Sequence, residues 1–333
     1  MVTTRVADWV PVIRREYLLD FIRNGGAAVK FAVPQSEVVC SEIMDALGKE
    51  AREAGYLFVA LDAAHTRLHM IDQIFHAVAK QVDWDALAKR FLRSTLSEKH
   101  YIIPDEYDGC SLDKVAALNS MDLGEMRQSV NQLLRDRLYH DYAMTQEFRI
   151  AMLRLCLAQL EPNEAAMGTA RAVKEWLRGE LRLVSSLKSA LIFQKVGRSN
   201  ARNMLFSLAH WLYLMGDAGL ALVLDITRFM ALRRPTEPDG TFYYSIAAVL
   251  DGYEVLRQFV DDTDEMEHCF ILVVGSPASL EPQEDNPRSV TAYQALWTRV
   301  ADEVRDRYRV NPLASLIRVS DCQADTAKGP GGG

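Results

Sequence analysis

The sequence predicts an α/β protein in which helices cover both faces of a parallel sheet and a large all-α insertion interrupts the chain. Short apolar runs of strand length alternate with helical patterns near both ends of the chain, as in parallel sheets. Between them, residues 67–216 repeat apolar side chains with the helical spacing. With 333 residues, 49% apolar and 25% charged, the chain can bury a large core.

The N-terminal part is expected to contain two strand-to-helix steps. A helix over residues 9–23 stops at Gly25 or Gly26, and an apolar strand follows over 27–33. Ser36 is placed to cap the next helix by accepting from its free amides. That helix has one apolar face with a spacing of four and ends near Gly55: Val39, Ile43, Leu47 and Ala51. The continuous apolar run 56–63 predicts the second strand.

The middle of the chain predicts helices, and the C-terminal part returns to alternation. Ser199 and Gly216 are expected to cap the last helix of the insertion. The helical segments of the insertion are 68–82, 112–142, 147–161, 164–181 and 199–216. The C-terminal strands are expected at 219–226, 269–277 and 313–319, with helices at 244–262 and 291–308. We therefore expect five strands, divided into an α/β core (1–66 and 217–320), the insertion (67–216) and a glycine-rich disordered tail (321–333).

Composition excludes several classes of protein. No run of about 18 uncharged apolar residues occurs, and the N-terminus has no secretory pattern, so we expect a cytoplasmic protein without membrane contact. The five cysteines are odd in number, widely spaced and never in CxxC pairs, which fits neither a disulfide framework nor a zinc site. A net charge of −7 gives no global attraction to nucleic acid, so DNA contact would need a local basic patch.

The stretch KFAVPQSEVVCSEIMDAL, residues 30–47, has the strand–loop–helix order of a P-loop without its phosphate-binding residues. A GxxxxGK[ST] loop uses glycines so that successive amides can cradle phosphates, a lysine for charge and a hydroxyl for magnesium. Here the strand meets the helix through Pro34, Gln35 and Ser36, and Pro34 removes one amide donor. Only Ser36 resembles the magnesium-side hydroxyl.

A second alignment places the loop at NGGAAVKF, residues 24–31, with Lys30 in the lysine position. Asn24, Val29 and Phe31 then replace the first glycine, the second glycine and the hydroxyl. No long amphipathic helix follows at once, so the preferred interpretation is that Gly25 and Gly26 end a helix and begin a strand.

The acidic element of the site is also incomplete. Asp225 ends an apolar strand at the position of a magnesium-coordinating Walker B aspartate, but Ile226 follows where hydrolytic relatives place a glutamate. Ser276 forms the polar tip of the strand 269–277 and completes the remnants of the pocket. Loss of one group that stabilises the transition state costs about 100- to 1000-fold in rate, so several losses together argue against efficient hydrolysis.

Five segments of the sequence resemble the ATP-binding proteins of BREX anti-phage defence systems, the BrxC/BrxD-like P-loop group. The resemblance covers about residues 170–319 and extends more weakly through 25–33 and 64–84. Its segments are AVKEWLRGEL, LIFQKVGRSNARNMLFSLAHWL, GLALVLDITR, YSIAAVLDGYEVLRQFVDDTDEMEHCFILVVGSP and AYQALWTRVADEVRDRYRVNPLASLIRV. The resemblance implies a P-loop NTPase (AAA+-like) core, oligomerisation or DNA engagement, and partners within a defence complex.

Two functions are consistent with this sequence. The first is a catalytically degenerate subunit that binds no cofactor and acts as a scaffold or regulator in a defence complex. The alternative is an active ATPase that binds ATP and magnesium and completes its pocket with a neighbouring subunit, where Arg198, Arg202 or Arg228 would act in trans. Coupling to DNA belongs to this alternative. Arg198 and Arg202 flank a helix start, which suggests a nearby phosphate of nucleotide or DNA, and Arg233 with Arg234 forms a second small basic patch.

Two further clusters are weighed as metal sites. A helical face would bring together His65, His69, Asp72 and His76, but no HExxH occurs and a packed or solvated face is preferred. The acidic stretch 261–265 lacks the glycine and glutamate positions of a calcium loop. No GxSxG motif or paired cysteine and histidine predicts a nucleophile.

Overall fold

The computed structural model describes residues 3–105, 110–233, 240–283, 285–301 and 310–321. The chain forms two compact units: unit 1 combines residues 1–74 with 218–333, and unit 2 is the intervening segment 75–217. The chain passes between the units inside α3 (Ile71–Lys80) and just before β4 (Gly219–Asp225). Each unit is described separately below.

Unit 1 is built on a six-stranded parallel sheet with the order β1-β6-β2-β5-β4-β3. The strands are β1 (Thr4–Arg5), β2 (Ala27–Pro34), β3 (Tyr56–Asp62), β4 (Gly219–Asp225), β5 (Cys269–Val274) and β6 (Leu316–Ser320). The α/β class with a parallel sheet, predicted from the apolar runs, is confirmed. The sequence missed β1, because two residues are too few to show an alternating pattern. β5 lies between β2 and β4, which therefore do not pair directly.

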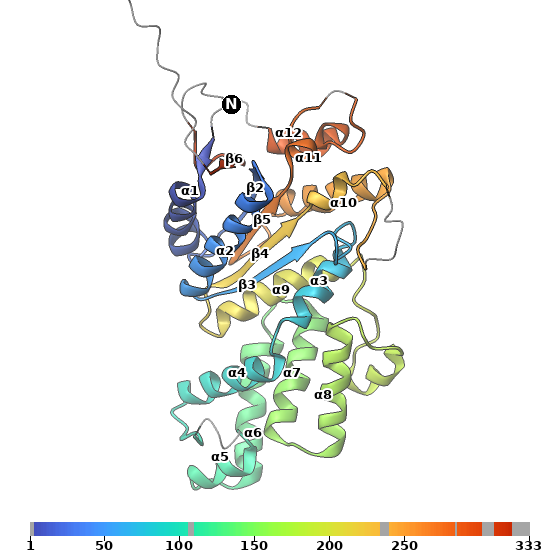
Figure 1. Ribbon diagram of the computed structural model, residues 1–333. Helices are drawn as coiled ribbons and strands as arrows, with labels where there is room; N and C mark the ends of the chain where they lie inside the picture. Colours follow the sequence, from blue (N-terminus) through green and yellow to red (C-terminus); the bar gives the residue numbers. More distant parts are fainter. Residues whose placement is uncertain (1–2, 106–109, 234–239, 284, 302–309, 322–333) are drawn as a thin grey trace, which may run out of the picture. The chain divides into compact units, whose positions relative to one another are not determined.

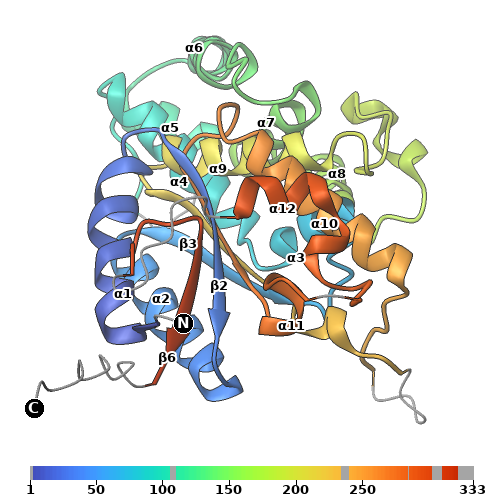
Figure 2. The ribbon, with the colours of Figure 1, turned by 90° about the horizontal axis from the view of Figure 1, so that it is seen from above.

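Helices cover both faces of this sheet (Figures 1 and 2). One face carries α1 (Val6–Val12), the π-helical η1 (Ile13–Phe21) and α2 (Glu37–Glu53). The other carries α10 (Ile246–Asp261), α11 (Pro277–Leu280) and α12 (Gln294–Val300), with the short η5 (Thr227–Met230) and η6 (Val290–Ala292) nearby in the chain. On the first face, Val39, Ile43, Leu47 and Ala51 of α2 are all buried against strands, as their spacing predicted.

The ends of several helices test the predicted caps. Gly25 has φ +99° and Gly216 φ +84°, the left-handed conformation that ends a helix, so both predictions are confirmed. Ser36 caps α2 by accepting from the amide of Val39 at 3.3 Å. The predicted cap at Ser199 is wrong, because Asn200 occupies the N-cap position of α9.

Two predicted helices of unit 1 have different bounds. The N-terminal helix begins at Val6 rather than Trp9, and after Pro11 it continues with π-helical bonding. Proline provides no amide for the α-helical ladder, which favours such a local change in register. The helix expected over 291–308 is observed as α12 to Val300; residues 302–309 and the predicted tail from 322 lie outside the described residues.

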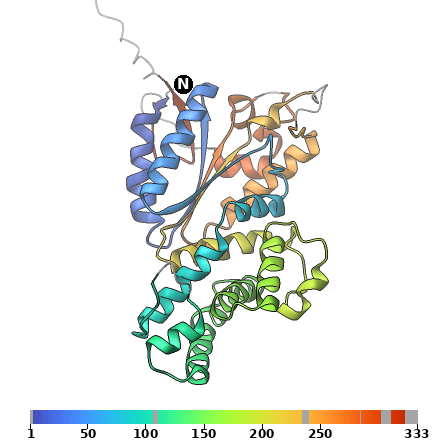
Figure 3. The same ribbon diagram turned by 60° about the horizontal axis from the view of Figure 1, so that its bottom comes forward.

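Unit 2 is all-helical (Figure 3). Its elements after α3 are α4 (Trp84–Glu98), α5 (Leu112–Leu118), α6 (Leu123–Leu134), η3 (Arg135–Tyr139), α7 (Gln146–Leu160), α8 (Glu164–Leu177), η4 (Val184–Ala190) and α9 (Ala201–Leu214). α7 packs against α4, α8 and α9 and has buried residues on every side, as expected for a central helix. The sequence missed α4, and the single helix expected over 112–142 is broken near Ser120, which has φ +52°.

Candidate functional site

The connection between β2 and α2, where a P-loop would bind phosphate, consists of two residues. Gln35 donates its amide to the carbonyl of Val319 in β6 at 2.9 Å, and the Ser36 hydroxyl caps the helix. Pro34 is the last residue of β2 and has no amide to donate. Glu37, in the first turn of α2, adds an exposed carboxylate where a phosphate would approach. The Gln35 amide is therefore used in bonding to the sheet, and the Ser36 hydroxyl is used in capping the helix.

Asp225 occupies the carboxyl end of β4, in register with Asp62 of β3 and Val274 of β5. Its Oδ1 accepts from the amide of Thr227 at 2.8 Å, and its Oδ2 lies 3.9 Å from Sγ of Cys40 in α2. The strand order thus brings the β2–α2 junction and Asp225 to the same edge of the sheet. This is the edge where open α/β sheets bind ligands.

The environment of Asp225 does not favour a charged carboxylate. Burial raises the pKa of Asp225, and the nearby charge of Asp62 raises it further, while hydrogen bonds from Thr227 act in the opposite direction. Burial, followed by the charge of Asp225, raises the pKa of the Cys40 thiol to about 12. Cys40 is therefore a protonated thiol at neutral pH rather than a nucleophile.

The residue after Asp225 carries no group that could polarise water. Ile226 is fully buried, and its amide donates to the carbonyl of Val274 at 2.8 Å. An aliphatic side chain at this position contributes to the core and has no proton to exchange. Ile226 itself therefore cannot act as a base toward water.

The pKa of Asp225 gives a testable prediction. Because folding raises this pKa above its ordinary value of 3.8, wild-type stability falls as the pH rises through the window that begins near 3.8. We expect Asp225→Asn, which preserves the acceptor for Thr227, to raise the free energy of unfolding at pH 7 by about 1 kcal/mol. The gain should shrink toward pH 4, measured by urea denaturation at several pH values.

Glu42→Gln, on the exposed side of α2, is the matched control and should leave stability within about 0.5 kcal/mol of wild type. A loss of stability at pH 7 in Asp225→Asn would show instead that the folded protein uses the charged carboxylate.

Ser276 lies at the end of β5, between the ends of β2 and β4. It is the N-cap residue of the four-residue α11, and its hydroxyl contacts Oγ of Ser279 at 3.5 Å. The preceding Gly275 donates its amide to the carbonyl of Ala32 in β2 at 3.0 Å. The structure thus places Ser276 on the same sheet edge as Ser36 and Asp225.

The arginines predicted to contact phosphate are dispersed. Arg228 donates to Oγ1 of Thr241 at 2.6 Å and to the carbonyl of Phe242 at 3.2 Å, so it holds a loop of unit 1. Arg233 is exposed, and Arg234 lies outside the described residues. Arg198 and Arg202 belong to unit 2, where Arg198 is exposed and Arg202 is the second residue of α9.

The alternative loop with Lys30 as the phosphate lysine is wrong. Lys30 lies within β2 and is only 6% exposed, and its Nζ donates to the carbonyls of Leu313 and Ala314. It therefore connects β2 to the segment before β6.

The histidines weighed as a metal site do not share one helical face. Residues 65–70 form turns, and α3 begins only at Ile71. His65 accompanies Asp62, with Nδ1 at 2.9 Å from Oδ1, and His69 packs edge-on against Tyr244. Among the described residues, no group of three or more histidine, cysteine, aspartate or glutamate side chains is arranged to hold a metal ion.

Sequence reasoning missed two residues beside Asp225. Asp62 ends the apolar run of β3 just as Asp225 ends that of β4, a signal that was available in the sequence. Cys40 lies one helical turn after Ser36, but its approach to Asp225 depends on the packing of α2 against the sheet.

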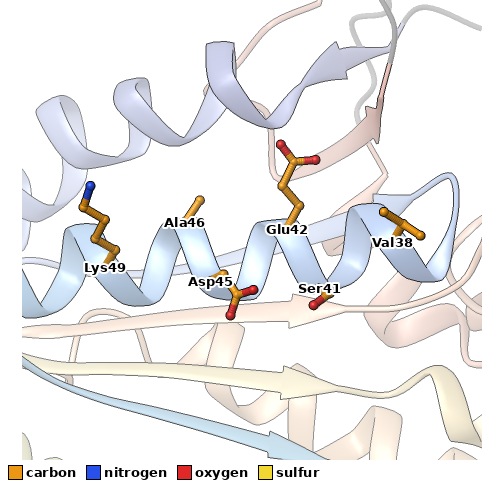
Figure 4. A pocket seen from close by; sticks show the side chains of 6 residues that line it. All are labelled: Val38, Ser41, Glu42, Asp45, Ala46 and Lys49. Atoms are coloured by element: carbon orange, nitrogen blue, oxygen red, sulfur yellow. The ribbon is translucent and has the colours of Figure 1, made fainter.

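The described surface contains a second feature on α2, a shallow hollow along its outer side (Figure 4). Its lining includes Glu42 and Asp45 together with Lys49. Two carboxylates against one ammonium group give no attraction for a phosphate.

In the described chain, no helix is long and apolar enough to cross a membrane.

A parallel sheet with a strand–loop–helix junction at β2 and an aspartate at the end of β4 is consistent with a P-loop NTPase-like fold. The chain belongs to the family of BREX system ATP-binding proteins BrxC/D, whose family model matches residues 16–328. Membership implies a role in a phage defence system. Comparisons with curated proteins and with solved structures gave no match.

Proposed function

We propose that this protein is a catalytically degenerate member of its family, a P-loop-fold subunit that serves as a scaffold or regulator in a phage defence complex. The observation that carries the proposal is the two-residue connection between β2 and α2. Gln35 gives its amide to β6 and Ser36 gives its hydroxyl to the helix cap. A triphosphate would find neither a glycine cradle nor a lysine in this connection.

The acidic side of the site supports the same proposal. Hydrolysis needs a group that orients water and donors that stabilise the developing charge. Asp225 remains, but buried Ile226 follows it and Cys40 approaches its carboxylate. Asp225 alone would supply at most one ligand to a magnesium ion.

The subunit role includes an assembly with other defence proteins. Family membership supports partners within a BREX system. Oligomerisation, contact with DNA and a cytoplasmic location are parts of the same proposal. The basic side chains proposed to contact DNA are Arg198, Arg202, Arg233 and Arg234.

The test is whether the protein binds Mg·ATP. A site occupied at 100 times its Kd would add about 2.7 kcal/mol to stability, which thermal unfolding detects easily. We expect a melting-temperature shift below about 1 °C at millimolar Mg·ATP, no retention of nucleotide in equilibrium dialysis, and no phosphate release. A family member that retains GxxxxGK[ST] serves as the positive control.

Asp225→Ala separates this proposal from the alternative of an active ATPase whose pocket a neighbouring subunit completes. That alternative requires a saturable Mg·ATP response, alone or with partner proteins, which Asp225→Ala removes. Such a response, or a nonhydrolysable nucleotide bound between Ser36 and Asp225 in a crystal, would overturn the degenerate function.

A further inference from the structure

One segment of unit 2 concentrates positive charge in an acidic protein. Between residues 181 and 216 the sequence contains five lysines and arginines and no aspartate or glutamate, although the whole chain has a net charge of −7. Four of these cations are exposed, and their side chains make no ion pair within the described part of the chain: Arg182, Lys188, Lys195 and Arg198. All four lie in residues 182–198, which we name the basic segment.

The same segment exposes large apolar side chains. Leu183, Leu191 and Phe193 are 70%, 56% and 68% exposed. They alternate with side chains that anchor the segment in the core of unit 2: Leu187, Ala190, Ile192 and Val196. Three apolar side chains at such exposure within one short segment form the kind of patch that marks an interaction surface.

Backbone strain occurs at the centre of this patch. Leu191 has φ +65° and ψ +29°, the left-handed conformation. That conformation is unfavourable for a leucine and ordinary for glycine. Leu191 therefore carries a backbone cost that burial of its side chain does not offset. Strained residues of this kind cluster where a ligand or a partner binds.

The basic segment packs on α7 and α8 through η4; it lies beside α8 in Figure 1. Arg154 of α7 donates to the carbonyls of Ser189 and Ala190 at 3.4 and 3.3 Å. Trp176 of α8 donates to the carbonyl of Gln194 at 2.9 Å, and Gln194 donates to Glu147. A surface that is already ordered loses little entropy when a partner binds.

We propose that the basic segment is the docking surface for an acidic, apolar stretch of a partner protein, in which aspartates or glutamates are interspersed with leucine or phenylalanine. The unpaired cations select a partner of opposite charge. Exposed leucines contribute nothing to binding a phosphate backbone, which depends on charge. A protein that binds single strands would present several aromatic rings, whereas this segment exposes one. The combination of cations with leucines therefore favours a protein over a nucleic acid.

This inference rests on the proposed role as a subunit of a complex, but not on the state of the nucleotide site. A positive Mg·ATP test would leave it intact, and a failed docking test would leave the degenerate site intact.

The probe is a fluorescent synthetic peptide of about 20 residues in which glutamates alternate with leucines and phenylalanines, measured by fluorescence anisotropy with the full chain. One control peptide replaces glutamate by glutamine, a second replaces the apolar residues by serine, and a single-stranded oligonucleotide of equal charge tests nucleic acid. We expect a Kd of the order of 10 μM for the probe and at least tenfold weaker binding of all three controls.

Variants assign the binding to the basic segment. Leu183→Ser with Phe193→Ser, and separately Lys195→Glu with Arg198→Glu, should each weaken binding of the probe at least tenfold. Lys49→Glu, at an exposed lysine in unit 1, should leave it unchanged. Leu191→Gly should weaken binding about threefold while the melting temperature stays the same or rises, because glycine relieves the strained backbone.

The inference is overturned if the probe fails to bind, or if the serine peptide binds as well as the probe, which would reduce the effect to charge alone. It is also overturned if the oligonucleotide binds more tightly than the probe peptide and the same variants lose that binding, because the surface would then bind nucleic acid. Circular dichroism melts of each variant confirm that a loss of binding occurs in a folded chain.

Discussion

Replacing Gly219 by alanine is expected to lower the free energy of unfolding of unit 1 by about 4 kcal/mol or more. Gly219 begins β4 with φ +126°, a conformation that side chains rarely adopt. A Cβ there would lie 2.0 Å from the carbonyl oxygen of His268. That carbonyl accepts the amide of Leu220 at 2.9 Å, so the clash cannot be relieved without disturbing the β4–β5 pairing. Urea denaturation measures the effect.

The matched control is Gly168→Ala, in the second turn of α8, where a Cβ would have nothing within 4 Å. This substitution should stabilise the protein by about 0.5–1 kcal/mol, because alanine favours the helix and restricts the unfolded chain. A Gly219→Ala protein as stable as wild type would contradict the close approach of β4 and β5 at this point.

Replacing Lys30 by methionine is expected to destabilise unit 1 by about 2–3 kcal/mol. Nζ of Lys30 donates to the carbonyls of Leu313 at 2.5 Å and Ala314 at 3.2 Å, and lies 4.7 Å from the ring centre of Tyr17. Methionine preserves most of the side-chain volume but leaves both carbonyls without this donor. Because those carbonyls precede β6 (Leu316–Ser320), the loss weakens the attachment of β6 to β2.

Lys49→Met is the control for Lys30→Met, because the Lys49 side chain is 72% exposed and reaches Glu53 only at 4.0 Å. We expect a change within about 0.5 kcal/mol for this exposed pair. If Lys30→Met folded with full stability and abolished a response to nucleotide, Lys30 would be a phosphate ligand after all, and the structural role assigned to it would be wrong.

Both substitutions act on unit 1 without touching Asp225, so they separate the stability of the sheet from the chemistry of its edge. A degenerate ATPase that has kept its fold should tolerate changes at Asp225 better than changes at Gly219 or Lys30. Stability measurements on these variants report the packing of the sheet, whereas the Mg·ATP test reports the state of the site at its edge.

The sequence alone determined the local features of this protein. Continuous apolar runs specified five of the six strands, because parallel strands are covered on both faces. Ser36, Gly25 and Gly216 specified helix ends, because caps depend on the side chain and backbone of one residue. The sequence also showed that β2 is followed by no P-loop glycines or lysine and that Ile226 follows Asp225. These features can be recognised in sequence because P-loop chemistry depends on residue types at fixed spacing.

Only the tertiary structure decided which residues meet. The placement of β5 between β2 and β4, the contact of Cys40 with Asp225 and the burial of Lys30 under Leu313 all join positions far apart in the chain. The outward direction of Leu191 and Phe193 likewise depends on how Ile192 and its neighbours pack on α7 and α8. Such pairings arise from strand order and helix packing, which no periodicity within a single segment encodes.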